Sequence, residues 1–274
     1  AAPSVLPAKL CLVSKGKPQS LNVLAQESDL NRKAAQLLQR FVRETSGGEL
    51  PIVANGRRSK NCVVIGESTN EAIDDGYVID CSRGTLAIKT AGGKGAIYGV
   101  VALLEKQLGV DYLAKDFYTL TPSADVRIPQ MHVAESPAFR CRQTFSYSNN
   151  DSTYRDWMRL QEHREMFAAD MWVHTFDRLL PSSVYGKSHP EYYSFINGER
   201  RPGNHSQWCL TNPDIFEIVA HRIDSIFKAN PNQNMISVSQ NDGNATYCQC
   251  PECRKVNEYE GSPAGCYVRF LNRL

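Results

Sequence analysis

Apolar positions in the first half of the chain follow two periods, which predict alternating strands and helices. A spacing of three and four residues from Leu30 to Val42 predicts a helix that Ser28 or Asp29 caps and Gly47 ends. Alternating or short apolar segments predict strands at 9–13, 50–53, 62–65, 76–81 and 85–90, and a second helix at 96–108. Together these elements predict a small α/β sandwich.

The pattern changes after a proline-containing segment with little periodicity, where we expect a linker at residues 126–137. Beyond it, strands predicted at 139–147, 168–176 and 235–239 alternate with helices predicted at 154–166, 213–227 and 265–274. Strand–helix repetition with long insertions after strands is typical of a (β/α)8 TIM barrel, although a doubly wound sheet gives a similar pattern. Because only the first part of a barrel fits, we expect a fragment of a longer protein.

The fold class predicted is therefore α/β, with two domains. Residues 1–125 are expected to form the α/β accessory domain, and residues 138–274 the N-terminal part of an incomplete TIM barrel. No apolar segment approaches the roughly 20 residues that span a bilayer, so no membrane-spanning segment is expected. The net charge of +2, with scattered Lys and Arg, argues against a nucleic-acid partner.

Several ordered blocks of sequence resemble known families. The blocks 75–79, 84–88, 95–100, 103–105 and 108–110 resemble the N-terminal accessory domain of α-glucuronidases and β-hexosaminidases. The second half resembles an uncharacterised carbohydrate-associated barrel family, domain of unknown function 4838, whose members occur largely in polysaccharide-degrading bacteria. The blocks that carry this second resemblance are His174, 189–192, 197–200, 209–213, 237–243, 247–253 and 260–263.

The resemblance implies a glycoside hydrolase acting on a complex polysaccharide or its oligosaccharides, α-glucuronidase-like, with carbohydrate as its partner. It implies a bacterial protein that is secreted, periplasmic or at the cell surface, with no cofactor required for catalysis. In the α-glucuronidase pattern the catalytic acid follows the fourth strand and its partner a later one, so we expect the pair to be missing and the fragment to be inactive. The alternatives are a non-catalytic glycan-binding protein and a metal-dependent hydrolase.

Asp242 is the candidate catalytic carboxylate, because it directly follows a predicted strand and active sites of barrels lie at strand C-termini. Gln240 and Asn241 beside it suit hydrogen bonding to sugar hydroxyls, although Asn241-Asp242-Gly243 also has the composition of a simple turn. His174 ends another predicted strand. The remaining candidates for substrate binding lie in loops: Glu191, Tyr192, Arg200 and His205. Of these, Arg200 is a candidate partner for the carboxylate of a sugar acid.

The chain has nine cysteines, and three of them lie within six residues. Cys248, Cys250 and Cys253 form this group, and Cys209 belongs to the same family motif. Four thiolates match the tetrahedral preference of structural zinc, with no open position for catalysis. Disulfides are the alternative for a protein outside the cytosol. The sequence leaves a structural zinc and a pair of disulfides open.

Overall fold

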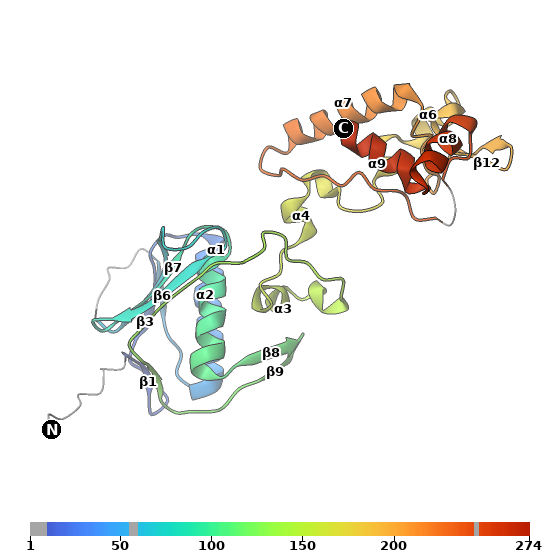
Figure 1. Cartoon of the computed structure of the whole chain (residues 1–274). Coiled ribbons are helices and arrows are strands. Elements are labelled where there is room, and N and C mark those ends of the chain that lie inside the picture. The colour runs from blue at the N-terminus through green and yellow to red at the C-terminus, as the bar shows by residue number, and fades with distance from the viewer. Residues whose placement is uncertain (1–9, 55–59, 244–246) are drawn as a thin grey trace. The chain divides into compact units, whose positions relative to one another are not determined.

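A computed structural model describes residues 10–54, 60–243 and 247–274 of the chain, whose elements are drawn in Figure 1. The chain divides into two units, Ala1–Gln161 and Glu162–Leu274. Both contain helices and strands, which confirms a mixed α/β architecture with several sheets.

A six-stranded sheet forms the centre of the first unit. Its strands, in spatial order, are β11 (Met131–Glu135), β6 (Tyr77–Ser82), β7 (Thr85–Thr90), β5 (Cys62–Ser68), β3 (Leu21–Leu24) and β4 (Ile52–Ala54). Strands β4, β3, β5 and β7 are parallel, whereas β6 and β11 are antiparallel to their neighbours. The predicted hairpin joins β6 to β7 through Arg83 and Gly84, whose φ angles of 51° and 77° suit a tight hairpin turn.

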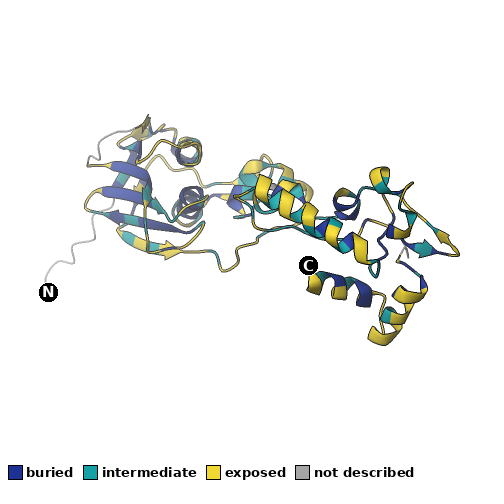
Figure 2. Cartoon of the chain, turned by 90° about the horizontal axis from the view of Figure 1, so that it is seen from above, coloured by how far each residue is buried: buried dark blue, intermediate teal, exposed yellow. Residues whose placement is uncertain are grey.

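Two helices pack on this sheet. Helix α1 (Asp29–Ser46) begins where Ser28 accepts a hydrogen bond from the backbone of Asn31, and it ends at Gly47 with a φ of 77°. Helix α2 (Gly95–Leu103) continues as a π-helical turn, η1 (Leu104–Leu108). Apolar side chains of α1, α2 and the sheet form one buried core, and Figure 2 shows how burial concentrates in the sheet.

Smaller sheets complete the first unit. They are the three-stranded sheet of β10 (Val126–Ile128), β1 (Leu10–Ser14) and β2 (Lys17–Pro18), and the pair of β8 (Asp111–Ala114) and β9 (Phe117–Thr119). Residue 9 of the first predicted strand lies outside the described residues.

The linker predicted at residues 126–137 is wrong. Strand β10 pairs with β1, and β11 pairs with β6 over its whole length. Both segments become strands because β1 and β6 each have an edge whose backbone groups can pair with a further strand. Pro129 lies between the two strands, where no ladder N–H is needed. Helix α3 (Ser152–Trp157), after the 3₁₀ turn η2 (Tyr147–Asn150), also belongs to this unit, because Trp157 is buried against Phe41 with ring centroids 5.2 Å apart.

Helices and irregular segments make up most of the second unit. Its elements are α4 (His163–Met166), η3 (Ala168–Asp170), α5 (Phe176–Leu179), α6 (Ser182–Tyr185), η4 (Pro190–Tyr192), β12 (Phe195–Ile196), β13 (Glu199–Arg200), α7 (Pro213–Ala229), α8 (Pro251–Glu260) and α9 (Ala264–Arg273). Helix α7 begins as predicted, because the Asn212 side chain accepts from the backbone of Asp214 and Pro213 occupies the first turn. Helix α9 matches the helix predicted at 265–274.

The regular barrel strands predicted for the second half are not formed in the described residues. Residues 139–147 have no strand, and 168–176 contain left-handed residues at Ala169, Asp170 and His174, which interrupt a β ladder. The segments 167–175 and 235–239 nevertheless lie side by side, joined by a parallel bridge from Phe167 to Met235 and backbone hydrogen bonds such as Ser237 N to Met171 O, 2.8 Å. A closed or partial barrel sheet is therefore not confirmed.

A helix that crosses a bilayer has to be both long and apolar. Within the described parts of the chain, no helix is both long enough and apolar enough to cross a bilayer.

Candidate functional site

Four buried thiols lie together in the second unit. The Sγ atoms of Cys209, Cys248, Cys250 and Cys253 are all within 4.8 Å of one another. Cys209 Sγ is 3.7 Å from Cys250 Sγ and 3.9 Å from Cys253 Sγ. The structure thus brings together the four cysteines predicted as metal ligands.

Local structure explains why these side chains converge. Cys250 is the N-cap of α8, with Pro251 next to it, so Cys253 lies in the first turn of the same helix. Cys209 arrives from a distant segment, where its backbone N–H donates to Tyr192 O at 2.8 Å. The cluster is therefore formed where the start of α8 and the residues before it contact the distant segment that contains Cys209.

The spacing of the sulfur atoms fits a single tetrahedral ion. Zinc–sulfur bonds of about 2.3 Å place tetrahedral ligands ~3.8 Å apart, and the two distances from Cys209 are 3.7 and 3.9 Å. A disulfide requires sulfur atoms about 2.05 Å apart, which is well below the distances from Cys209 Sγ to Cys250 Sγ and Cys253 Sγ. The residues therefore fit a metal ion better than the alternative pair of disulfides.

Polar groups around the cysteine cluster stabilise negative charge on sulfur. The backbone N–H of Phe195 donates to Cys248 Sγ at 3.3 Å, and Arg200 Nη1 lies 3.7 Å from the same atom. The Thr211 hydroxyl is 3.2 Å from Cys253 Sγ. Sequence reasoning missed Thr211, for which its position two residues after Cys209 is the available signal.

Hydrogen bonds from Cys248 and Cys253 lower the pKa of Cys209, and hydrogen bonds from Arg200 and Thr211 act in the same direction. Arg200 also donates to Tyr193 O at 2.8 Å. The residue predicted to meet a sugar carboxylate therefore lies against the cysteine cluster, with its donors directed at a sulfur and a carbonyl.

Exposed polar side chains gather around residues 240–242. His174 Nδ1 is 3.1 Å from the carbonyl oxygen of Gln240, and His205 Nδ1 is 3.2 Å from that of Asp242. The side chains of these four residues are exposed. The structure thus brings His174, His205, Gln240 and Asp242 to one surface, named here the Asp242 surface.

Asn241 serves the structure of the loop. Its side chain donates to Ser206 O at 2.6 Å and accepts from the backbone N–H of Asp177 at 3.1 Å. The Gln207 side chain bonds both the N–H and the C=O of Asn241, at 3.0 and 2.8 Å. Asn241 is buried, so its amide is not available to a sugar in this conformation. Gln207, two residues before Cys209, was not singled out from the sequence.

The side chains of Glu191 and Tyr192 make contacts away from the Asp242 surface. The Glu191 carboxylate is 3.0 Å from His189 Nδ1, and a backbone hydrogen bond and His189 lower its pKa. The Tyr192 ring is buried and stacks on His189, with centroids 4.7 Å apart. Trp208 is likewise buried, face to face with Phe176. These rings therefore pack in the interior of the second unit and do not form a sugar platform in this conformation.

The cysteine cluster adjoins the Asp242 surface and an open groove. Gln240, Tyr247 and Cys248 line one small cavity of about 10 Å³. Tyr247 and Cys248 also line a groove of about 650 Å³, with Arg254, Asn257 and Glu258 of α8 in its wall.

Similar solved structures are glycosidases, matched at low scores. A mutant β-hexosaminidase from Streptomyces plicatus is 18% identical over 51% of this chain and 26% of that chain, with a TM-score of 0.36. The GH20 β-N-acetylhexosaminidase from Streptomyces coelicolor A3(2) is 16% identical over 80% of this chain and 43% of that chain, with a TM-score of 0.38. The GH115 4-O-methyl-α-glucuronidase BtGH115A is 17% identical over 48% of this chain and 19% of that chain, with a TM-score of 0.39.

The chain spans less than half the length of each of the three. No curated protein sequence matches the chain significantly. Residues 112–274, more than half of the chain, match the family model described as Domain of unknown function (DUF4838). The family predicted from the motif blocks is confirmed, and the chain belongs to the DUF4838 family.

Proposed function

We propose that the second unit is part of a carbohydrate-active domain and that the Asp242 surface contacts the sugar. The observation that carries this proposal is the convergence of His174 and His205 on the carbonyls of Gln240 and Asp242, at 3.1 and 3.2 Å. Side chains from three separate segments thereby present imidazole, amide and carboxylate groups together. Such planar polar groups are well suited to hydrogen-bond sugar hydroxyls.

The two histidines have defined roles in this proposal. A carbonyl oxygen only accepts hydrogen bonds, so Nδ1 of each ring carries the proton and Nε2 of the neutral ring is an acceptor. His174 and His205 would accept from sugar hydroxyls, Gln240 would donate through its amide, and Asp242 would accept through its carboxylate. Together they would fix the orientation of one sugar residue.

The reaction we propose for the whole protein is hydrolysis of a glycosidic bond in a polysaccharide, by a domain of (β/α)8 type related in character to α-glucuronidases. Hydrolysis of this kind needs two carboxyl groups flanking the bond. Asp242 is the one carboxylate in the set of four residues that form the Asp242 surface. A glycan-binding role without hydrolysis is therefore the second candidate, and a secreted or periplasmic location suits both.

We also propose that the cysteine cluster holds a structural zinc ion. Four sulfur ligands leave no open coordination position, so the ion would cross-link the chain and take no part in catalysis. Gln207, which comes shortly before Cys209 in the chain, hydrogen-bonds to the backbone of Asn241. Cys248 follows Asn241 and Asp242 along the chain. The cross-link would thus hold both sides of the segment that carries Asp242.

The test is product release from a panel of polysaccharides, measured together with glycan binding, for the whole protein of which this chain is the expected fragment and for its Asp242→Ala variant. Asp224→Ala, which removes an exposed carboxylate on α7, is the matched control. Release of sugars that is lost only in Asp242→Ala supports a hydrolase. Binding without release, again lost only in Asp242→Ala, supports the glycan-binding protein. Binding or release that Asp242→Ala leaves unchanged refutes the proposed surface.

A further inference from the structure

The groove of about 650 Å³ beside helix α8, named here the α8 groove, has no ligand in the proposed function. Its volume falls within the ~300–1,000 Å³ that is typical of small-molecule sites. The aromatic and polar side chains of its wall come from α8 and from the residues on either side of this helix: Tyr247, Gln249, Arg254, Asn257, Glu258 and Ser262.

The α8 groove is connected to the Asp242 surface through Gln240 and Tyr247. Both residues line the small cavity of about 10 Å³, and Tyr247 and Asn257 line the cavity and the groove alike. Gln240 is also part of the Asp242 surface, because its carbonyl oxygen lies 3.1 Å from His174 Nδ1. A glycan chain that contacts the Asp242 surface with one sugar can therefore reach the groove with the next.

Tyr247 presents an aromatic ring to the α8 groove. Its side chain is 39% exposed, in contrast to Trp208 and Tyr192, which are buried in the same unit. A tyrosine combines an apolar ring with a polar hydroxyl, so it suits ligands that have both kinds of surface. A sugar ring is such a ligand, with a C–H face that packs on the aromatic ring and hydroxyls around its edge.

Arg254 and Glu258 supply a donor and an acceptor that are available to a ligand. Both side chains are exposed, and neither has a hydrogen bond or an ion pair with a described residue. They are four residues apart on α8 and therefore lie on the same face of the helix. Between them, Asn257 accepts from the backbone N–H of Cys266 at 3.1 Å through Oδ1, which leaves its amide N–H groups as further donors.

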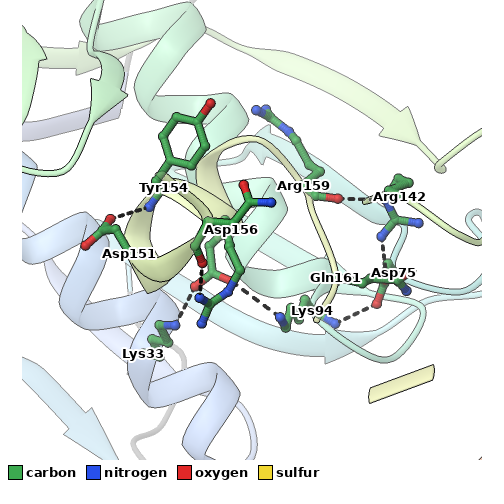
Figure 3. Close-up of polar contacts among 11 residues, drawn as sticks. Lys33, Asp75, Lys94, Arg142, Asp151, Tyr154, Asp156, Arg159 and Gln161 are labelled. Atoms are coloured by element: carbon green, nitrogen blue, oxygen red, sulfur yellow. Dashed lines mark hydrogen bonds and ion pairs between the residues drawn. The ribbon is translucent and has the colours of Figure 1, made fainter. Parts of the chain in front are cut away.

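The buried charges of the first unit show the opposite arrangement. Figure 3 shows Asp156 between Lys33 and Lys94, whose Nζ atoms lie 2.5 and 3.6 Å from its carboxylate oxygens. A ligand for this carboxylate would have to displace a protein partner, which leaves a charge uncompensated. The charged groups in the wall of the α8 groove have no such partner to lose.

We propose that the α8 groove binds the neutral sugar residue next to the one at the Asp242 surface, so that the chain recognises an oligosaccharide. This inference rests on the proposed function, because the Asp242 surface holds the first sugar. The guanidinium of Arg254 and the carboxylate of Glu258 carry opposite charges. A neutral ring can hydrogen-bond to both, whereas a charged ring is repelled by one of them.

The experiment is a calorimetric titration of the full chain with oligosaccharides of one to six residues, prepared from each neutral polysaccharide of the panel. We expect the longer oligosaccharides to bind roughly tenfold more tightly than the monosaccharide. Tyr247→Ala should weaken binding of the longer oligosaccharides roughly fivefold or more and leave monosaccharide binding unchanged. Tyr259→Ala is the matched control, because this tyrosine of α8 is 81% exposed and lies outside the groove wall.

Arg254→Ala is a second test, because Tyr247 is next to Cys248 of the cysteine cluster whereas the Arg254 side chain is exposed and contacts no described partner. It should weaken binding of the longer oligosaccharides roughly fivefold, with the melting temperature and the metal content of the parent.

The outcomes separate this inference from the proposed function. Affinity that does not depend on chain length, or that both groove variants leave unchanged while Asp242→Ala abolishes it, overturns the α8 groove and leaves the Asp242 surface standing. Equal loss of monosaccharide binding in both groove variants would place their effect at the Asp242 surface and would also overturn the inference. If no oligosaccharide of any length binds, the inference and the proposed sugar contact both fail.

Discussion

Replacing one cysteine of the cluster tests the proposed zinc site most directly. Cys209→Ser removes the ligand that comes from a distant segment, while Cys248, Cys250 and Cys253 remain within one short stretch. We expect one zinc ion per chain in the parent protein and none that resists mild chelation in the variant. The physical reason is that three thiols from one loop leave the tetrahedron incomplete and unlinked to the rest of the unit.

The expected loss of stability follows from linkage. An ion at ~1,000 times its dissociation constant stabilises the folded state by about 4 kcal/mol. For a unit of the size of Glu162–Leu274, each kcal/mol of lost stability lowers the melting temperature by about 4 °C. The melting temperature of the second unit should therefore be about 15 °C lower in Cys209→Ser than in the parent. The first unit contributes none of the four ligands, so its own transition should not move and serves as an internal reference.

The assay is metal analysis combined with scanning calorimetry, with and without a chelator. Cys266→Ser is the matched control, because Cys266 packs in the same cluster of buried cysteines but is not one of the four residues whose sulfur atoms lie within 4.8 Å of one another. It should retain the full metal content. Zinc content in Cys209→Ser equal to that of the parent, or a chelator that leaves both transitions unchanged, would refute the reasoning.

Three further substitutions test other contacts. Arg200→Gln removes the guanidinium beside Cys248 and should weaken zinc binding about tenfold, measured by competition with a chromogenic chelator; unchanged affinity would contradict this role. Asp156→Asn, at a 2% exposed carboxylate paired with two lysines, should cost the first unit about 1–3 kcal/mol in urea unfolding. Gly99→Ala places a Cβ 2.7 Å from Ile88 and should cost about 1–3 kcal/mol by the same assay, and an equally stable variant would disprove tight packing there.

Much of the first unit was predictable because its elements carry local signals. The caps at Ser28 and Gly47 and the turn at Arg83-Gly84 depend on the chemistry of a few neighbouring residues. Residues 126–137 were mistaken for a linker because short edge strands acquire their structure from the partner strand. No pattern within 126–137 itself indicates that β1 and β6 offer open edges.

In the second unit, local sequence signals determine less of the structure than long-range contacts do. Residues 168–176 have the composition of a strand, yet the left-handed residues Ala169, Asp170 and His174 interrupt it. Asn241 and Asp242 are adjacent and were both placed at the candidate sugar site. Hydrogen bonds to Ser206 and Gln207 bury Asn241 in the structure of the loop, whereas Asp242 is exposed. Such differences depend on contacts with residues more than thirty positions away.

The sequence by itself determined the family, the helices with strong caps, and the identity of the four cysteines, because these rest on residue type and short-range spacing. Only the tertiary structure decided that Cys209 joins Cys248, Cys250 and Cys253 at distances suited to one ion. It alone placed the Arg200 guanidinium beside the sulfur of Cys248. Long-range packing fixes which polar groups meet, and that pairing is not encoded in any local pattern of the chain.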